Sequence, residues 1–149
     1  MGRRISLGSP GLTVPFGNTA QRTANAGAGS LRFNTEINVL ELYNGTAWTP
    51  VGTLDGVTVT STYTASSGQQ IFCDTNSGGF TVNLPASPQQ NDTVRFYDLR
   101  KTFDSNALTI GRNGKLIQGD SSNMTVNSEG AAFEVVYSGD SYGWRIFTV

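Results

Sequence analysis

The pattern of hydrophobic and polar positions is clearest between residues 31 and 51. Leu31 and Phe33 fall on one side of an extended chain and Arg32 and Asn34 on the other, which is the two-residue period of a half-buried strand. An Asn-Gly pair at 44–45, where both residues tolerate positive φ, indicates a tight hairpin. The pattern predicts a three-stranded meander with strands at 31–34, 39–43 and 48–51. Three short strands cannot bury both of their faces, so we expect this meander to pack on something else.

Short strand-like runs continue after residue 56, about ten residues apart, with Gly-, Pro- and Asn-containing turns between them. This spacing is typical of an antiparallel β-sandwich, jelly-roll-like in character. No helical period persists for three turns. We expect about nine strands, at 57–64, 70–74, 80–84, 93–99, 107–112, 115–118, 124–127, 132–137 and 144–148.

The first 29 residues have a different character. They contain two prolines, six glycines and many small polar residues, with only scattered hydrophobic positions, so they cannot form a core of their own. Residues 1–35 carry four arginines and no acid, whereas the rest of the chain has a net charge of −5. The segment is interpreted either as a disordered tail or as an arm that orders on a neighbouring protein.

Composition argues against several classes of function. The chain of 149 residues has no histidine and a single cysteine, Cys73, which excludes an internal disulfide, the usual zinc sites and histidine-dependent nucleophiles. A sequence pI of about 5.2 opposes a nucleic-acid surface, and no segment is long and apolar enough for a membrane span. The start lacks the apolar region of a secretory signal. We therefore expect no enzyme activity, no cofactor, no metal and no export.

The segment AQRTANAGAGSLRFNTEINVLELYNGTAWTPVG, residues 20–52, resembles a recurrent segment of tailed-bacteriophage fibre and other virion proteins, of the form AxRPxxPxxGxIRYNTDTxxFExYxxGxWxxLG. The shared positions include the Arg-Phe-Asn-Thr run at 32–35, Glu41, Tyr43 and Trp48. The remainder of the chain is similar to a β-domain common near the C-termini of phage fibre proteins. Together the two similarities span about 130 residues, although this chain lacks a long repetitive shaft.

The resemblance implies a structural protein of a phage virion that forms a homotrimer. It is expected to be a short fibre or appendage of the tail, baseplate or neck, with a capsid decoration or head fibre as the alternative. We expect a virion-docking arm at 1–29, a meander at 30–54 that packs around a threefold axis, and a sandwich at 55–149. The expected trimer-packing residues are Phe33, Leu40, Leu42, Tyr43 and Trp48. The expected docking residues of the arm are Arg3, Arg4, Leu7, Leu12, Val14 and Phe16.

A rival hypothesis of a different class is a module that binds glycans on the host surface. Aromatic rings stack well on sugars, and Tyr142 and Trp144 lie near a turn at 139–140. These two residues are the candidate glycan contacts. Binding of the purified protein to host cells would favour this hypothesis over the purely structural one.

Overall fold

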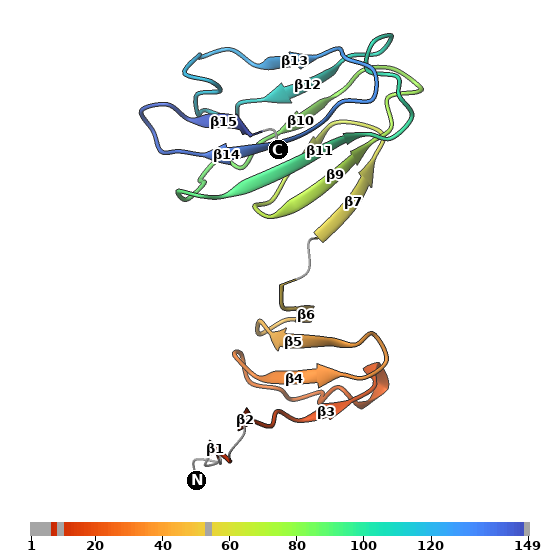
Figure 1. The fold of residues 1–149 in the computed structure, drawn as a ribbon, viewed down its shortest axis with the longest axis vertical. Coiled ribbons are helices and arrows are strands. Elements are labelled where there is room, and N and C mark those ends of the chain that lie inside the picture. The colour runs from red at the N-terminus through yellow and green to blue at the C-terminus, as the bar shows by residue number, and fades with distance from the viewer. Residues whose placement is uncertain (1–6, 9–10, 53–54, 148–149) are drawn as a thin grey trace. The chain divides into compact units, whose positions relative to one another are not determined.

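The computed structural model describes residues 7–8, 11–52 and 55–147, and over these residues the protein is built from β-strands and one short 3₁₀ turn (Figure 1). The expectation of an all-β protein is confirmed. The chain divides into two compact units, residues 1–53 and residues 54–149. We call them the first unit and the second unit and describe each by itself.

The first unit contains a four-stranded sheet, which we call the N-terminal sheet, with the strand order β3-β4-β5-β6. Its strands are β3 (Phe16–Gly17), β4 (Leu31–Asn34), β5 (Val39–Tyr43) and β6 (Trp48–Pro50). The last three are the predicted meander, paired antiparallel. At the hairpin, the Asn44 side-chain oxygen accepts hydrogen bonds from the backbone N–H groups of Thr46 and Ala47, both at 2.9 Å. Gly45 has a φ of 102°, so the predicted Asn-Gly hairpin is confirmed.

The arm predicted over 1–29 is corrected for its second half. Strand β3 pairs in parallel with β4, with Phe16 opposite Phe33. A 3₁₀ turn, η1 (Thr19–Gln21), follows and is closed by a reciprocal capping box between Asn18 and Gln21. Residues from 16 onward therefore belong to the N-terminal sheet and its cover. Sequence periodicity missed this because a two-residue strand has no period to detect.

Before β3, two short strands pair with each other, β1 (Leu7–Gly8) and β2 (Gly11–Leu12). Leu7 lies opposite Leu12 in this ladder. Arg3 and Arg4, two of the expected docking residues, lie outside the described residues.

The second unit is a sandwich of two sheets that share one hydrophobic core (Figure 1). The five-stranded sheet has the order β15-β14-β11-β9-β7, and the four-stranded sheet has the order β13-β12-β10-β8. The strands are β7 (Asp55–Val59), β8 (Tyr63–Thr64), β9 (Gln69–Cys73), β10 (Thr81–Asn83), β11 (Thr93–Asp98), β12 (Leu108–Gly111), β13 (Met124–Val126), β14 (Ala132–Tyr137) and β15 (Trp144–Phe147).

The predicted antiparallel arrangement is wrong for four of the seven strand pairs in the described part of the second unit. From β7 to β12 the chain alternates between the two sheets, so every second strand returns to the same sheet in the same direction. Antiparallel ladders join β11 to β14, β12 to β13 and β14 to β15. Periodicity within a strand carries no information on the direction of its neighbour, which explains the error.

The hydrophobic alternation did place the core correctly. In β9 the burial alternates residue by residue, with Ile71 and Cys73 fully buried, and in β11 Val94 and Phe96 are fully buried. Two predicted strands differ from the structure. The run at 57–64 breaks into β7 and β8, which lie in different sheets, and the run at 115–118 forms only isolated bridges at Ile117.

Candidate functional site

The N-terminal sheet carries charge on the face that is buried. Glu41 on β5 lies directly opposite Arg32 on β4, and its side chain is fully buried. Its carboxylate accepts hydrogen bonds from Arg22 at 2.5 Å, from Arg32 at 3.1 Å and from the Asn34 amide at 3.1 Å. We call Arg22, Arg32, Asn34 and Glu41 the ion-pair network. The hydrogen bond from Arg22, followed by the bond from Asn34 and the two positive charges, holds the pKa of Glu41 below its ordinary value against the opposing effect of burial.

The chain segment before β4 covers this charged face. The second guanidinium nitrogen of Arg32 donates to the backbone oxygen of Asn18 at 2.9 Å, and the Asn34 amide donates to the Thr19 hydroxyl at 3.1 Å. The backbone N–H of Thr19 in turn donates to Glu36 at 3.0 Å. Polar contacts, rather than apolar ones, therefore fasten the covering segment to the sheet.

Two of the expected trimer-packing residues lie on this covered face. Tyr43 and Trp48 are paired across β5 and β6, with ring centroids 5.4 Å apart, and the Arg32 guanidinium lies 5.8 Å from the Trp48 ring. Both rings are half-buried within their own unit. Phe33, Leu40 and Leu42 lie on the opposite face, because neighbouring residues of a strand point to opposite faces, so the five expected trimer-packing residues do not share one face.

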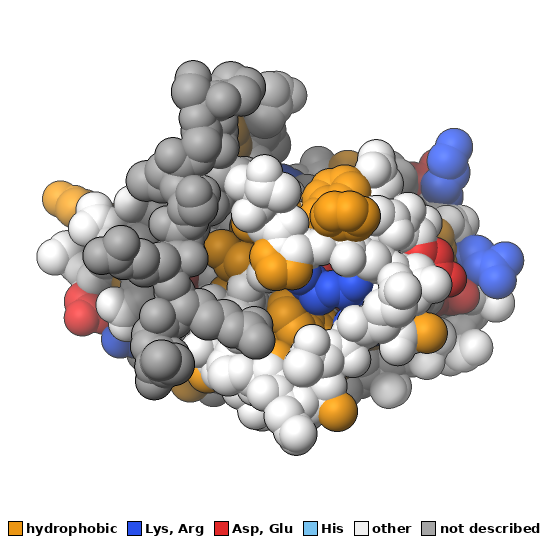
Figure 2. All heavy atoms as spheres, turned by 90° about the horizontal axis from the view of Figure 1, so that it is seen from below, with side chains coloured by type: hydrophobic (Ala, Val, Ile, Leu, Met, Phe, Trp, Pro, Cys, Tyr) orange, Lys and Arg blue, Asp and Glu red, His pale blue; other side chains and the backbone are white. Residues whose placement is uncertain are grey.

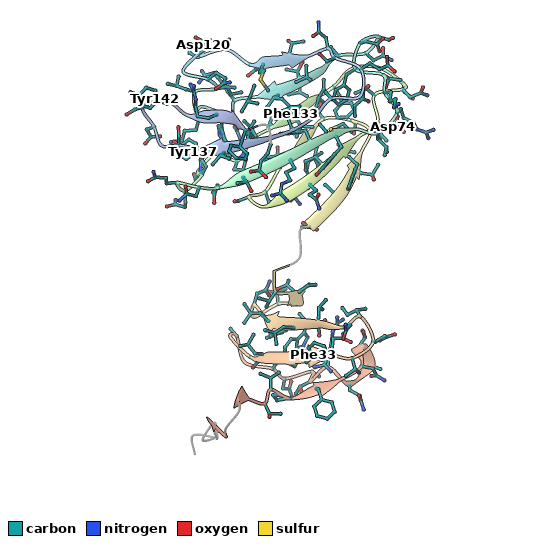
Figure 3. All side chains as sticks on the ribbon, viewed as in Figure 1. Phe33, Asp74, Asp120, Phe133, Tyr137 and Tyr142 are labelled. Atoms are coloured by element: carbon teal, nitrogen blue, oxygen red, sulfur yellow. The ribbon has the colours of Figure 1, made fainter. Side chains whose placement is uncertain are left out.

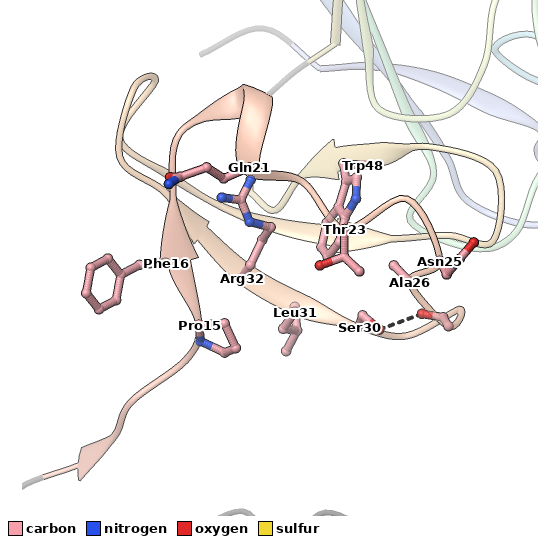
Figure 4. A pocket seen from close by; sticks show the side chains of 11 residues that line it. Pro15, Phe16, Gln21, Thr23, Asn25, Ala26, Ser30, Leu31, Arg32 and Trp48 are labelled. Carbon is pink, nitrogen blue, oxygen red and sulfur yellow. Dashed lines mark hydrogen bonds between the residues drawn. The ribbon is translucent and has the colours of Figure 1, made fainter.

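A cavity of about 600 Å³ opens beside Trp48 (Figure 4). Pro15, Leu31, Arg32 and Trp48 are among its lining residues, and the buried indole N–H of Trp48 has no hydrogen-bond partner. Figure 2 shows hydrophobic side chains gathered around a basic side chain on the face in view. The cavity brings an apolar wall and an unused donor together, but no pair of acid and base groups.

The opposite face of the N-terminal sheet is apolar. Phe16, Phe33 and Leu40 form one row across the strands, and the backbone bond from Val51 to Leu40 continues it onto the segment after β6. A second row contains Leu31 opposite Leu42. We call these six residues the apolar face: Phe16, Leu31, Phe33, Leu40, Leu42 and Val51.

Three of the six residues of the apolar face are exposed. Phe16 is 75% exposed, Val51 46% and Leu31 40%, while the other three members are half-buried. Sequence reasoning placed Phe33, Leu40 and Leu42 in a packing surface and did not include Leu31 and Val51. The alternation of Leu31 with Arg32 and Phe33 was the signal that assigns Leu31 to the same face.

The candidate glycan contacts separate in the structure. Tyr142 lies in the loop between β14 and β15 and is 64% exposed (Figure 3). Trp144 is fully buried in the sandwich core, with its ring 5.3 Å from that of Tyr137. Trp144 therefore offers no surface to a sugar, which corrects that assignment. The side chain turns inward because Trp144 pairs with Tyr137 in the ladder and shares its core-facing side.

The loop around Tyr142 carries a small polar cluster. Asp140 accepts hydrogen bonds from Tyr137 at 2.5 Å and from Lys115 at 2.7 Å. The hydrogen bond from Lys115 is the main cause of a lowered pKa of Asp140, and the hydrogen bond to Asp140 raises the pKa of Tyr137. The Asp140 side chain is largely exposed, so this is a solvated surface cluster.

The described residues hold no group of three or more acidic, cysteine or histidine side chains arranged to bind a metal ion. The Cys73 thiol is fully buried, and burial raises its pKa to about 12, which keeps it protonated and unreactive. Among the same residues no helix has the length and apolar character needed to cross a membrane.

No protein-family model matches the chain, and no curated protein sequence matches it. The described residues form a small sheet unit, one face of which is apolar and partly exposed, and a β-sandwich.

Proposed function

We propose that the protein is a non-enzymatic structural component of a tailed-bacteriophage virion, a short trimeric fibre or appendage attached through its N-terminal segment. The observation that supports this most is the exposed apolar face on the first unit. Monomeric soluble proteins rarely leave a contiguous apolar patch of this kind without a partner. The sequence resemblance of residues 20–52 to virion proteins gives the partner class, and the apolar face gives a surface suited to it.

Attachment is assigned to residues 1–14, because β3 and the residues after it are held in the first unit. Within the described residues, β1 and β2 pair only with each other, so no strand of the N-terminal sheet depends on them. Val14 is half-buried, and Phe16 is a member of the apolar face. We therefore confine the proposed docking segment to residues 1–14 and leave Phe16 out of it.

The test has two parts. Light scattering of the purified protein is expected to report three chains per particle, and a stable monomer at micromolar concentration would overturn the trimer. A variant that lacks residues 1–12 is expected to keep the mass and the melting temperature of the full chain but to be lost from purified phage particles. Equal copy numbers of truncated and full-length protein on the particles would show that attachment lies elsewhere.

A host-cell binding assay separates the structural function from a glycan-binding one. Tyr142 is the exposed aromatic residue on which the second function depends, and Tyr142→Ala leaves the core untouched. The structural function predicts no binding of the purified protein to host cells. Binding that Tyr142→Ala abolishes would favour the glycan module instead.

A further inference from the structure

We propose that the apolar face is the surface through which copies of this chain contact one another, and that Phe16 belongs to this contact rather than to the virion-docking segment. The inference rests on the proposed trimer and identifies its packing surface. It also predicts that the charged face of the same sheet makes no contact between copies, because the ion-pair network already pairs its charged groups within one chain.

The distribution of charge within the first unit supports self-association. The described part of this unit has four charged residues, Arg22, Arg32, Glu36 and Glu41. Three of them form the ion-pair network and the fourth binds the backbone of Thr19. The apolar face carries none. Residues close to a threefold axis approach their own copies, so a charge there would meet like charges, and an uncharged face avoids that repulsion.

The small size of the first unit favours a partner. Units below about 70–80 residues seldom gain enough stability from a single core and usually add disulfides, a metal or oligomerisation. Residues 1–53 contain no cysteine and no histidine, which removes the first option and the usual form of the second. The described residues of the unit leave Phe16, Leu31 and Val51 of the apolar face exposed. Oligomerisation is the option among these three that the composition of the unit leaves open, and contact between copies would bury this face.

The geometry of the face suits a contact between sheets. The row of Phe16, Phe33, Leu40 and Val51 crosses the whole width of the sheet, so a partner would meet it on every strand. The second row, Leu31 and Leu42, covers β4 and β5. Phe16 lies at one edge, on β3, and is the most exposed of the six. An aromatic side chain at the edge of an apolar surface can cover the flank of a neighbouring copy.

Cysteine cross-linking tests the surface directly. Cys73 is buried, so it does not compete with an introduced thiol in the native protein. Leu31→Cys and Phe16→Cys place a thiol on the apolar face, and Thr46→Cys places one at the exposed hairpin turn as a matched control. With a short bismaleimide, the two face variants are expected to give covalent dimers in most of the protein. The control is expected to remain monomeric on a denaturing gel.

A charge variant gives a second readout. Leu31→Glu places three like charges in the contact and is expected to lower the mass in light scattering from three chains to one, with the circular dichroism spectrum unchanged. Thr46→Glu is expected to keep the mass. If Leu31→Glu fails to fold, the cross-linking result stands by itself.

The outcomes distinguish the two proposals. A trimer whose Leu31→Cys and Phe16→Cys forms do not cross-link would overturn the assigned surface and leave the proposed function intact. A monomer would overturn both. A monomer whose face cysteines resist maleimide would show that the second unit of the same chain covers the apolar face.

Discussion

Replacing Glu41 by glutamine should destabilise the first unit more than any other single isosteric change in its sheet. The substitution keeps the shape of the side chain but leaves the Arg32 guanidinium, whose side chain is 6% exposed, without its anionic partner. Breaking a buried ion pair in this way typically costs about 3–5 kcal/mol. A folded unit of 53 residues has a free energy of unfolding of about 3–8 kcal/mol at the usual stability per residue. The variant is therefore expected to lose a large part of the stability of its first unit.

The two tryptophans allow this to be measured. Trp48 lies in the first unit and Trp144 in the second, so fluorescence during denaturant unfolding is expected to show one transition from each unit. In Glu41→Gln the Trp48 transition should move to much lower denaturant while the Trp144 transition stays in place. All variants have to be compared at one protein concentration, because association stabilises the folded state by mass action.

Matched variants test the physical reason. Glu36→Gln changes an exposed carboxylate that accepts one backbone hydrogen bond, and it is expected to cost no more than about 1 kcal/mol. Arg22→Gln should cost less than Arg32→Gln, because the Arg22 side chain is 32% exposed and water can solvate its surroundings. An unfolding free energy of Glu41→Gln within about 1 kcal/mol of the wild type would refute the reasoning, since it would mean that the network contributes little.

Three further predictions concern other parts of the molecule. The pKa of Glu41 is lowered in the folded state, so its contribution to stability is complete above the unfolded-state pKa near 4.5 and is lost as the pH falls further. The melting temperature of the Trp48 transition should therefore be flat from pH 5 to 8 and drop below pH 4.5. A constant melting temperature down to pH 3 would contradict this. Cys73 should not react with a thiol reagent at pH 8 until the protein unfolds, and rapid labelling of the native protein would show that the sandwich opens locally. Gly143→Ala should destabilise the second unit severely in thermal unfolding, because the new Cβ would lie 2.0 Å from the Leu116 carbonyl oxygen. Gly130 has a similar positive φ, but no atom lies near its Cβ position, so Gly130→Ala should cost only about 1–2 kcal/mol.

The sequence by itself determined much of the secondary structure. The alternation of Leu31, Arg32, Phe33 and Asn34 placed β4 and both of its faces correctly, and the Asn-Gly pair placed the hairpin between β5 and β6. Strand positions in the second unit were largely correct for the same reason. Side-chain alternation and turn chemistry are local properties of the chain, so they can be read from neighbouring residues.

Tertiary structure decided which residues meet. Strand direction in the sandwich depends on how the chain crosses between the two sheets. The four parallel strand pairs arise in this way, and the alternation of hydrophobic and polar residues did not indicate them. Trp144 has an aromatic ring of the kind that stacks on sugars, but its side chain points into the core beside Tyr137. Arg22 and Glu41 are 19 positions apart, and they come into contact because the segment before β4 folds back over the sheet. That contact buries the charged face, because a carboxylate held by two guanidinium groups and an amide is stable away from water. On the opposite face, the described residues leave Phe16, Leu31 and Val51 exposed.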